Sequence, residues 1–91
     1  MIFAYILGKV ERGSELDVLN ALKNFEQVEK ASIIYGAYDL CIEANFKTME
    51  ELNEFVFNAV RKTPGIKDTC TLIVAKIFHK KSQKRDVHGV A

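Results

Sequence analysis

The feature that most restricts the fold of this chain is the order in which strand-like and helix-like segments follow one another. Residues 2–10 are rich in β-branched, aromatic and aliphatic side chains and stop at a charged turn with Gly13, which predicts a strand. Two further runs of this kind, 28–35 and 39–45, are separated only by Gly36-Ala37-Tyr38. So short a connection predicts a hairpin.

Two segments carry the start signals of helices. Ser14, followed three residues later by Asp17, resembles a capping box, and we expect a helix over residues 15–25. Thr48 and Glu51 form a second capping box at the start of another helix. The apolar side chains expected to face the core are Leu16, Leu19, Ala21 and Leu22 in the first helix, and Leu52, Phe55, Val56, Ala59 and Val60 in the second.

The last patterned segment, residues 66–78, alternates with apolar side chains on both faces and predicts a long strand. The full order is then β-α-β-β-α-β, which is the order of the ferredoxin-like α+β fold. In that fold a four-stranded antiparallel sheet carries both helices on one face. Because the first and last strands are apolar on their outer face too, we expect the molecule to dimerise through the uncovered face.

Length and charge limit the number of domains and the class of partner. The 91 residues suffice for one domain, which we place at 1–78, followed by a basic tail, 79–91, that we expect to be flexible. The domain carries nine basic and eleven acidic side chains, whereas positive charge is concentrated in residues 80–85. Nucleic-acid binding needs clustered cations on a shaped surface. We therefore expect no sequence-specific DNA binding, and only weak contact through the tail.

The cysteines and the N-terminal residues indicate the compartment. Cys41 and Cys70 lie far apart in apolar contexts, without the spacing of a disulfide framework or a metal site. Residues 1–7 are apolar but lack a basic region, and they are too short for a signal peptide or a membrane span. We predict a cytoplasmic protein with packed, unreactive thiols and no membrane segment.

Few residues offer catalytic or metal chemistry. The histidines, His79 and His88, lie near the end of the last strand and in the tail, with lysine and arginine between them, so we expect no metal site. No nucleophile with a base and no carboxylate pair stands at a recognisable spacing. The sequence therefore predicts a protein that is not an enzyme and that needs no cofactor.

The turn at residues 35–39 combines backbone freedom with a charge. Gly36 allows a positive φ, consecutive backbone N–H groups can form an anion-binding nest, and Asp39 can take a cationic group. Together they match the carboxylate and ammonium of an α-amino acid. The same residues also make an ordinary turn in which Asp39 bonds a nearby amide. Thr69 and Thr71 add hydroxyls on one strand face, where threonine is equally common for structural reasons.

The segment Tyr35-Gly36-Ala37-Tyr38-Asp39-Leu40, with Arg61-Lys62-Thr63-Pro64-Gly65-Ile66 and Thr69-Cys70-Thr71 downstream, resembles the effector (RAM) domain of the Lrp/AsnC transcription regulators. The resemblance covers about residues 1–78. It implies a βαββαβ fold, dimers made by sheet packing, rings of dimers such as octamers, and amino-acid effectors bound between dimers. It also implies the ligand-binding residues: Tyr35, Gly36, Ala37, Tyr38 and Asp39 at the hairpin wall, with Thr69 and Thr71 facing the ligand from a neighbouring subunit.

The chain departs from the full regulators at its start, since its first strand begins at Ile2, where they carry a helix-turn-helix and a linker. It therefore resembles the stand-alone effector modules. This implies a sensor of free amino acids that forms homo-oligomers and modulates full-length Lrp/AsnC regulators. Two alternatives share the predicted topology: an oligomerisation module without a ligand, and a small dimeric α+β barrel enzyme. The fold alone does not separate them.

Overall fold

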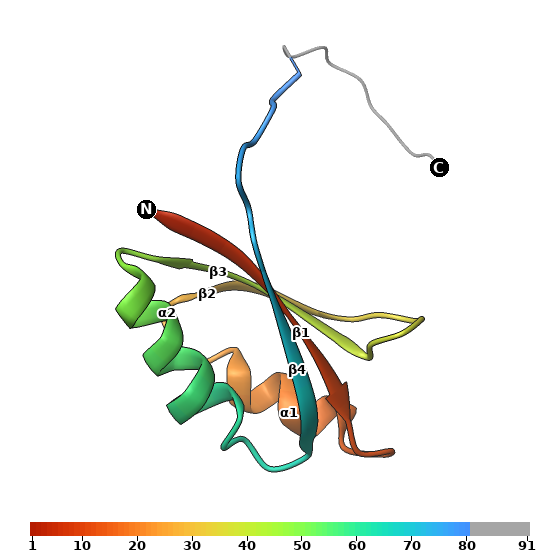
Figure 1. Cartoon of the computed structure of the whole chain (residues 1–91). Coiled ribbons are helices and arrows are strands. Elements are labelled where there is room, and N and C mark those ends of the chain that lie inside the picture. The colour runs from red at the N-terminus through yellow and green to blue at the C-terminus, as the bar shows by residue number, and fades with distance from the viewer. Residues whose placement is uncertain (81–91) are drawn as a thin grey trace.

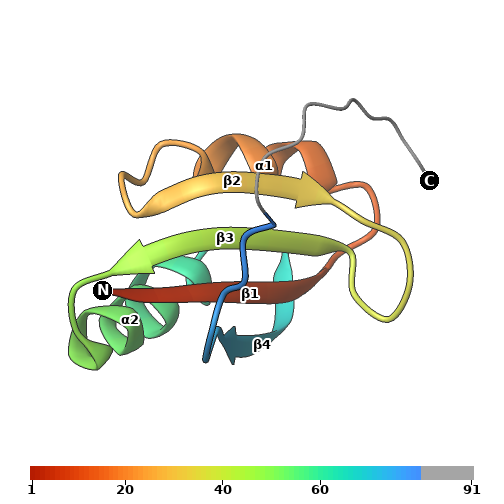
Figure 2. The same cartoon turned by 90° about the horizontal axis from the view of Figure 1, so that it is seen from above.

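A computed structural model of the chain describes residues 1–80, and its elements follow the predicted order (Figure 1). The four strands form one antiparallel sheet in the order β2-β3-β1-β4, and both helices cover the same face, which confirms the ferredoxin-like α+β fold (Figure 2). The elements are β1 Ile2–Val10, α1 Glu15–Leu22, β2 Val28–Ile33, β3 Leu40–Phe46, α2 Met49–Phe55, the π-helical turn η1 Val56–Val60, and β4 Ile66–Ile73.

The core lies between the helices and one face of the two central strands. Alternate residues of β1 and β3 are buried, as the period of two in a strand requires, and Ile6 lies opposite Ile42 in the sheet. Full burial of one such side chain contributes roughly 1.5–3 kcal/mol, so this face holds the two layers together. The buried apolar residues are Ala4, Ile6 and Val10 of β1, Leu40, Ile42, Ala44 and Phe46 of β3, and Val18, Leu22, Leu52, Phe55, Val56 and Val60 of the helical segments.

The second helical segment follows its prediction closely. The backbone N–H of Glu51 donates to the Thr48 hydroxyl (3.1 Å), and the Glu51 carboxylate accepts from the backbone N–H of Lys47 (2.6 Å). All five predicted apolar residues are buried or packed against the core. The π-helical turn η1 was not predicted. It closes with a bond from the N–H of Arg61 to the carbonyl of Val56 (3.0 Å).

The first helix differs from its prediction in three respects. It ends at Leu22 rather than at residue 25, Leu16 is 67% exposed, and Val18 takes the buried position instead. Ala21 is also exposed. Ser14 makes no side-chain capping bond with the described residues. The burial of Val18 in place of Leu16 follows from a close approach by a distant part of the chain, described next.

Gly65 allows the loop before β4 to lie against the start of α1. Its φ is +100°, and a Cβ at this position would come within 2.9 Å of Val18 Cγ2 and 3.0 Å of Ser14 Cβ. Ser14 and Val18 therefore share one contact surface, which fixes the rotation of the helix about its axis. This rotation turns Leu16 outward, and local sequence cannot reveal it because the contact spans about fifty residues.

The last three strands differ from their predicted ranges at the ends. The hairpin strands are β2 Val28–Ile33 and β3 Leu40–Phe46, and β4 ends at Ile73 rather than at residue 78. The N–H of Val74 still donates to the carbonyl of Phe3 (2.9 Å), but β1 begins only one residue earlier, so the following residues have no strand to pair with. Residues 75–80 leave the sheet on the side opposite the helices (Figure 1). Except for residues 79–80, the predicted tail lies outside the described residues.

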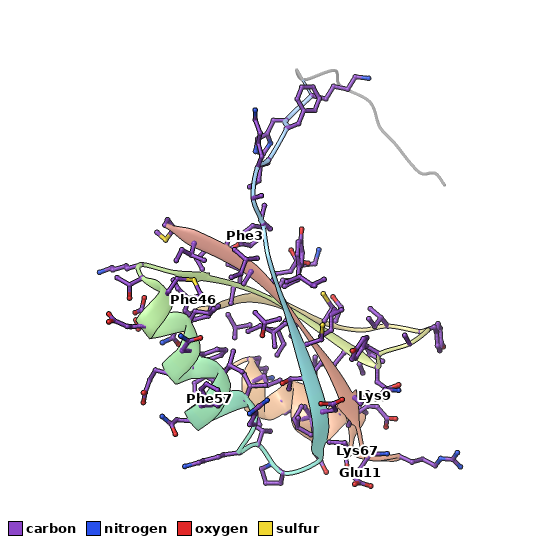
Figure 3. The ribbon with its side chains drawn as sticks, viewed as in Figure 1. Phe3, Lys9, Glu11, Phe46, Phe57 and Lys67 are labelled. Atoms are coloured by element: carbon purple, nitrogen blue, oxygen red, sulfur yellow. The ribbon has the colours of Figure 1, made fainter. Side chains whose placement is uncertain are left out.

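The uncovered face of the sheet is apolar across β1 and β4. Phe3 lies on this face (Figure 3), its ring is 5.4 Å from that of Tyr5, and Leu72, opposite Tyr5, is 48% exposed. The β2 edge is more polar, with an ion pair between Lys30 and Glu43 (3.7 Å). We call the apolar part the open face, made of Phe3, Tyr5, Leu7, Cys41, Cys70 and Leu72.

Candidate ligand-binding site

Asp39 joins the hairpin to the end of β1. Its carboxylate oxygen Oδ2 accepts a hydrogen bond from the backbone N–H of Val10 (2.9 Å), and its own N–H donates to the carbonyl of Gly8 (2.9 Å). Its carbonyl accepts from the N–H of Ile34 across the hairpin (2.9 Å). Asp39 therefore has a structural role, but the amide that its carboxylate binds belongs to β1 and not to the turn itself. Within residues 1–80 its second carboxylate oxygen, Oδ1, has no hydrogen-bond partner.

The rest of the hairpin extends beyond the helices (Figure 1). Gly36 has a φ of +125°, as its predicted turn role requires, and Tyr35 is fully exposed. Tyr38 instead turns back toward the open face, where the Nζ of Lys9 lies 5.8 Å from its ring centroid. The pKa of the Tyr38 hydroxyl is raised, chiefly by the neighbouring Cys70 side chain. Tyr38 thus lies beside Lys9 of β1.

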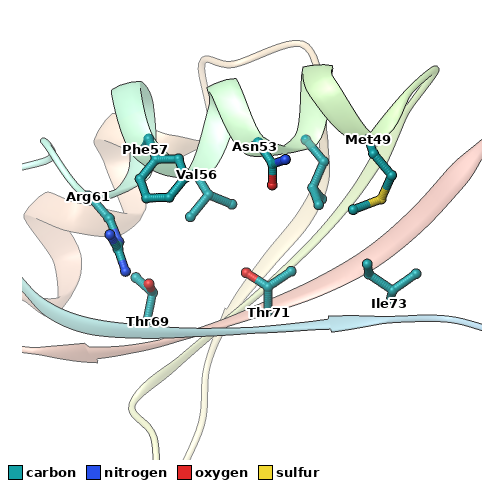
Figure 4. A pocket seen from close by; sticks show the side chains of 9 residues that line it. Met49, Asn53, Val56, Phe57, Arg61, Thr69, Thr71 and Ile73 are labelled. Carbon is teal, nitrogen blue, oxygen red and sulfur yellow. The ribbon is translucent and has the colours of Figure 1, made fainter.

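A cleft of about 300 Å³ lies between the α2–η1 segment and β4 (Figure 4). Thr69 and Thr71 stand opposite Gly8 and Ile6 of β1, so their side chains face the helices, and both line the cleft. The cleft is open at its edge because β4 is the last strand of the sheet. Its lining consists of Met49, Leu52, Asn53, Val56, Phe57, Arg61, Thr69, Thr71 and Ile73.

Within one chain the predicted ligand-binding residues form two separate groups. Thr69 and Thr71 come together in the cleft, whereas residues 35–39 lie outside it. β1 separates the two groups: Gly8 pairs with Thr69 on one side and accepts the N–H of Asp39 on the other. A single chain therefore does not bring the hairpin to the threonines. The resemblance had implied such a division, since it assigns the two groups to different subunits.

Sequence reasoning missed the residues that give the cleft its chemical character. The guanidinium carbon of Arg61 lies 4.8 Å from the ring centroid of Phe57, which is 53% exposed. Figure 4 shows the Arg61 and Thr69 side chains pointing toward one another, with Asn53 above Thr71. Asn53 and Phe57 lie outside the apolar stripe of the helix that faces the core. Their position outside it was the feature of the sequence that could have indicated a second functional surface. The described lining holds one cation and no carboxylate.

The two cysteines lie on the open face, outside the cleft. Leu7 pairs with Cys41 on one side and with Cys70 on the other, so two strand spacings, together about 10 Å, separate them. That exceeds the reach of a disulfide, and both thiols are free. Burial, followed by the nearby Glu43 carboxylate, raises the pKa of Cys41. Within residues 1–80, no three potential ligands from His, Cys, Asp and Glu cluster to hold a metal ion.

Comparison with protein families identifies the domain. A family model described as the Lrp/AsnC ligand binding domain matches residues 4–83. The HTH-type transcriptional regulator FL11 of Pyrococcus abyssi is 33% identical over 75 residues, which cover 82% of this chain and 49% of the regulator. The chain thus spans about half the length of the curated relatives it matches first.

Solved structures have the same architecture. Protein PHS023 of Pyrococcus horikoshii is 31% identical with a TM-score of 0.78, and the match covers 91% of this chain and 100% of that one. The transcriptional regulator NMB0573 of Neisseria meningitidis, solved as a complex with L-methionine, has a TM-score of 0.81 over 91% of this chain and 56% of its own. At 21% identity that likeness shows the fold alone. On the family match and the relatives, this chain belongs to the Lrp/AsnC ligand-binding domain family.

Proposed function

We propose that this domain senses a free amino acid in the regulation of transcription and binds it between subunits of a homo-oligomer. The observation that carries the proposal is the cleft beside β4, where Thr69 and Thr71 face an open space large enough for a small ligand. The hairpin lies on the other side of β1. The two groups complete one site when the hairpin of one subunit reaches the cleft of another.

The chemistry of the hairpin suits the two charged groups of an amino acid. In this proposal, backbone N–H groups around Gly36, which has a positive φ, take the ligand carboxylate, and Oδ1 of Asp39, without a hydrogen-bond partner within residues 1–80, takes its ammonium group. The hydroxyls of Thr69 and Thr71 then contact the rest of the ligand. Tyr35 and Tyr38 supply flanking aromatic surface.

The open face supports an oligomer built on a sheet-packed dimer. Its apolar side chains are only partly covered in one chain, and a twofold axis through this face would bury the same patch of both subunits. Dimers would then assemble into rings, with 1–78 as the folded unit and full-length Lrp/AsnC regulators as further partners. No helix among residues 1–80 has the length and apolar character needed to cross a membrane. A cytoplasmic location fits this reading.

One observation favours a second candidate, an oligomerisation module that binds no effector. The bond from Val10 to Asp39 gives the aspartate a structural reason to be present, so its charge does not require a ligand. The relatives, being transcription regulators, favour regulation over the alternative of a barrel enzyme.

A thermal-shift screen of the twenty amino acids separates the two candidates. A ligand at one hundred times its dissociation constant adds about 2.7 kcal/mol of stability per site. In a domain of this size each kcal/mol raises Tm by roughly 4–8 °C, so binding is easily detected. An effector module responds to a subset of amino acids. If none of the twenty shifts Tm, the oligomerisation module is the better reading.

A further inference from the structure

Resting on the proposed function, we propose that the cleft receives the effector's side chain and that Arg61 selects a side chain ending in a carboxylate. The hairpin accounts for the α-carboxylate and the ammonium group of the ligand. It leaves the side chain to the cleft, whose lining determines which amino acid fits. That lining has a cationic end and an apolar end.

The charge of the cleft favours an anion. Arg61 is the one charged residue in the described lining. The single ion pair within residues 1–80 joins Lys30 to Glu43, so no carboxylate of that range forms an ion pair with Arg61. Asp68, on the adjoining part of β4, lines a neighbouring hollow together with Arg61, and its Oδ1 accepts a bond from the N–H of Thr69 (3.0 Å). A ligand carboxylate gains an ion pair here, whereas a lysine-type side chain meets the like charge of Arg61.

The geometry of Arg61 suits a carboxylate. Its guanidinium is 4.8 Å from the Phe57 ring centroid, a distance at which a cation is attracted to the ring, and this contact restricts its rotamers. The side chain points toward Thr69 across the mouth of the cleft (Figure 4). The fork of N–H donors and the hydroxyl of Thr69 converge on one region, which matches the two oxygens of a carboxylate.

The other end of the cleft suits a methylene stem. Met49 is 44% exposed and Ile73 is 48% exposed, and both line the cleft together with Leu52 and Val56. These half-exposed side chains lose apolar surface to water when a stem lies against them. A volume of about 300 Å³ is at the small end of ligand pockets and fits a short chain. The class indicated is therefore an amino acid with an acidic side chain on a methylene stem, such as glutamate.

Calorimetric titration of the full chain with L-glutamate, L-methionine and L-lysine tests this inference. Glutamate and methionine have similar length and differ in the terminal charge. Because Arg61 and the side-chain carboxylate of glutamate would form a charge-assisted pair at an open site, we expect wild type to bind glutamate about tenfold more tightly than methionine or lysine. Arg61→Met keeps an apolar chain over Phe57 but removes the charge. It should lower glutamate affinity about tenfold and change methionine affinity less than about twofold.

Lys62→Met is the matched control, because it removes an exposed cation next in sequence that does not line the cleft. It should leave glutamate affinity unchanged. Equal loss in both variants would indicate a general effect of net charge and overturn the role of Arg61. Equal binding of glutamate and methionine by wild type and Arg61→Met, or tighter binding of lysine, would overturn the inference while leaving amino-acid sensing intact. Absence of a Tm shift with all twenty amino acids in the thermal-shift screen would overturn both.

Discussion

Replacing Asp39 with alanine tests whether this residue stabilises the fold as well as serving the ligand. Its carboxylate accepts the N–H of Val10, a residue 29 positions away, at 2.9 Å in a half-buried location. The substitution leaves the Val10 N–H without this acceptor. A bond to a charged partner contributes about 1.5–3 kcal/mol, and water can reach part of the site, so we expect a loss of about 1–2 kcal/mol. The corresponding fall in Tm is roughly 4–16 °C.

Urea unfolding followed by circular dichroism measures this loss directly. Asp68→Ala is the matched control, because Asp68 also accepts a backbone N–H, but from the next residue and in an exposed position. It should cost less than about 0.5 kcal/mol. Asp39→Asn keeps an acceptor for Val10 and removes the charge, so it should recover most of the stability while still weakening amino-acid binding. A free energy of unfolding of Asp39→Ala within 0.5 kcal/mol of wild type, roughly the spread of ordinary surface substitutions, would refute the reasoning.

Three further predictions concern the open face, Gly65 and the basic tail. Leu7→Glu should convert the oligomer into a monomer, because the charge enters the proposed interface, and light scattering measures the mass. Leu16→Glu, on the exposed side of α1, should not change the mass. Gly65→Ala should lower the free energy of unfolding, measured in urea, by about 2–4 kcal/mol, since the site combines a positive φ with a 2.9 Å contact. Gly13→Ala should lower it by only about 1 kcal/mol, because Gly13 has a φ of +89° but open space around it. Truncation after Phe78 should abolish a weak, salt-sensitive binding of DNA, and a sequence-specific complex that survives it would contradict this view.

The sequence predicts a structural feature correctly when the residues that determine that feature lie close together in the chain. The second helix was predicted correctly because Thr48, Glu51 and a period of 3.6 residues all lie within the segment. The face of α1 was predicted wrongly because it depends on Gly65, which is distant in sequence. Likewise β4 is shorter than its apolar pattern because its partner, β1, begins at Ile2. An apolar run can extend as a strand only as far as a neighbour exists to pair with it.

The same distinction between local and distant determinants explains which residues of the candidate site were predicted. Thr69 and Thr71 were placed on one face correctly, because alternation in a strand is local. The glycine turn was also evident from sequence, but the partner of Asp39, Val10, lies in another strand. Arg61 opens one of the segments that carry the family resemblance, but the sequence did not assign it to the site, because its surroundings in the cleft come from α2 and β4 together.

The position of β1 between the hairpin and the cleft has a consequence for how binding would be measured. Each chain carries one hairpin and one cleft, facing away from each other across the same strand. In the proposed arrangement the number of complete sites equals the number of subunits, and each site exists only where two chains meet. Ligand binding and assembly are then linked equilibria, so each strengthens the other. The apparent affinity for the effector should accordingly rise with protein concentration until every chain is incorporated.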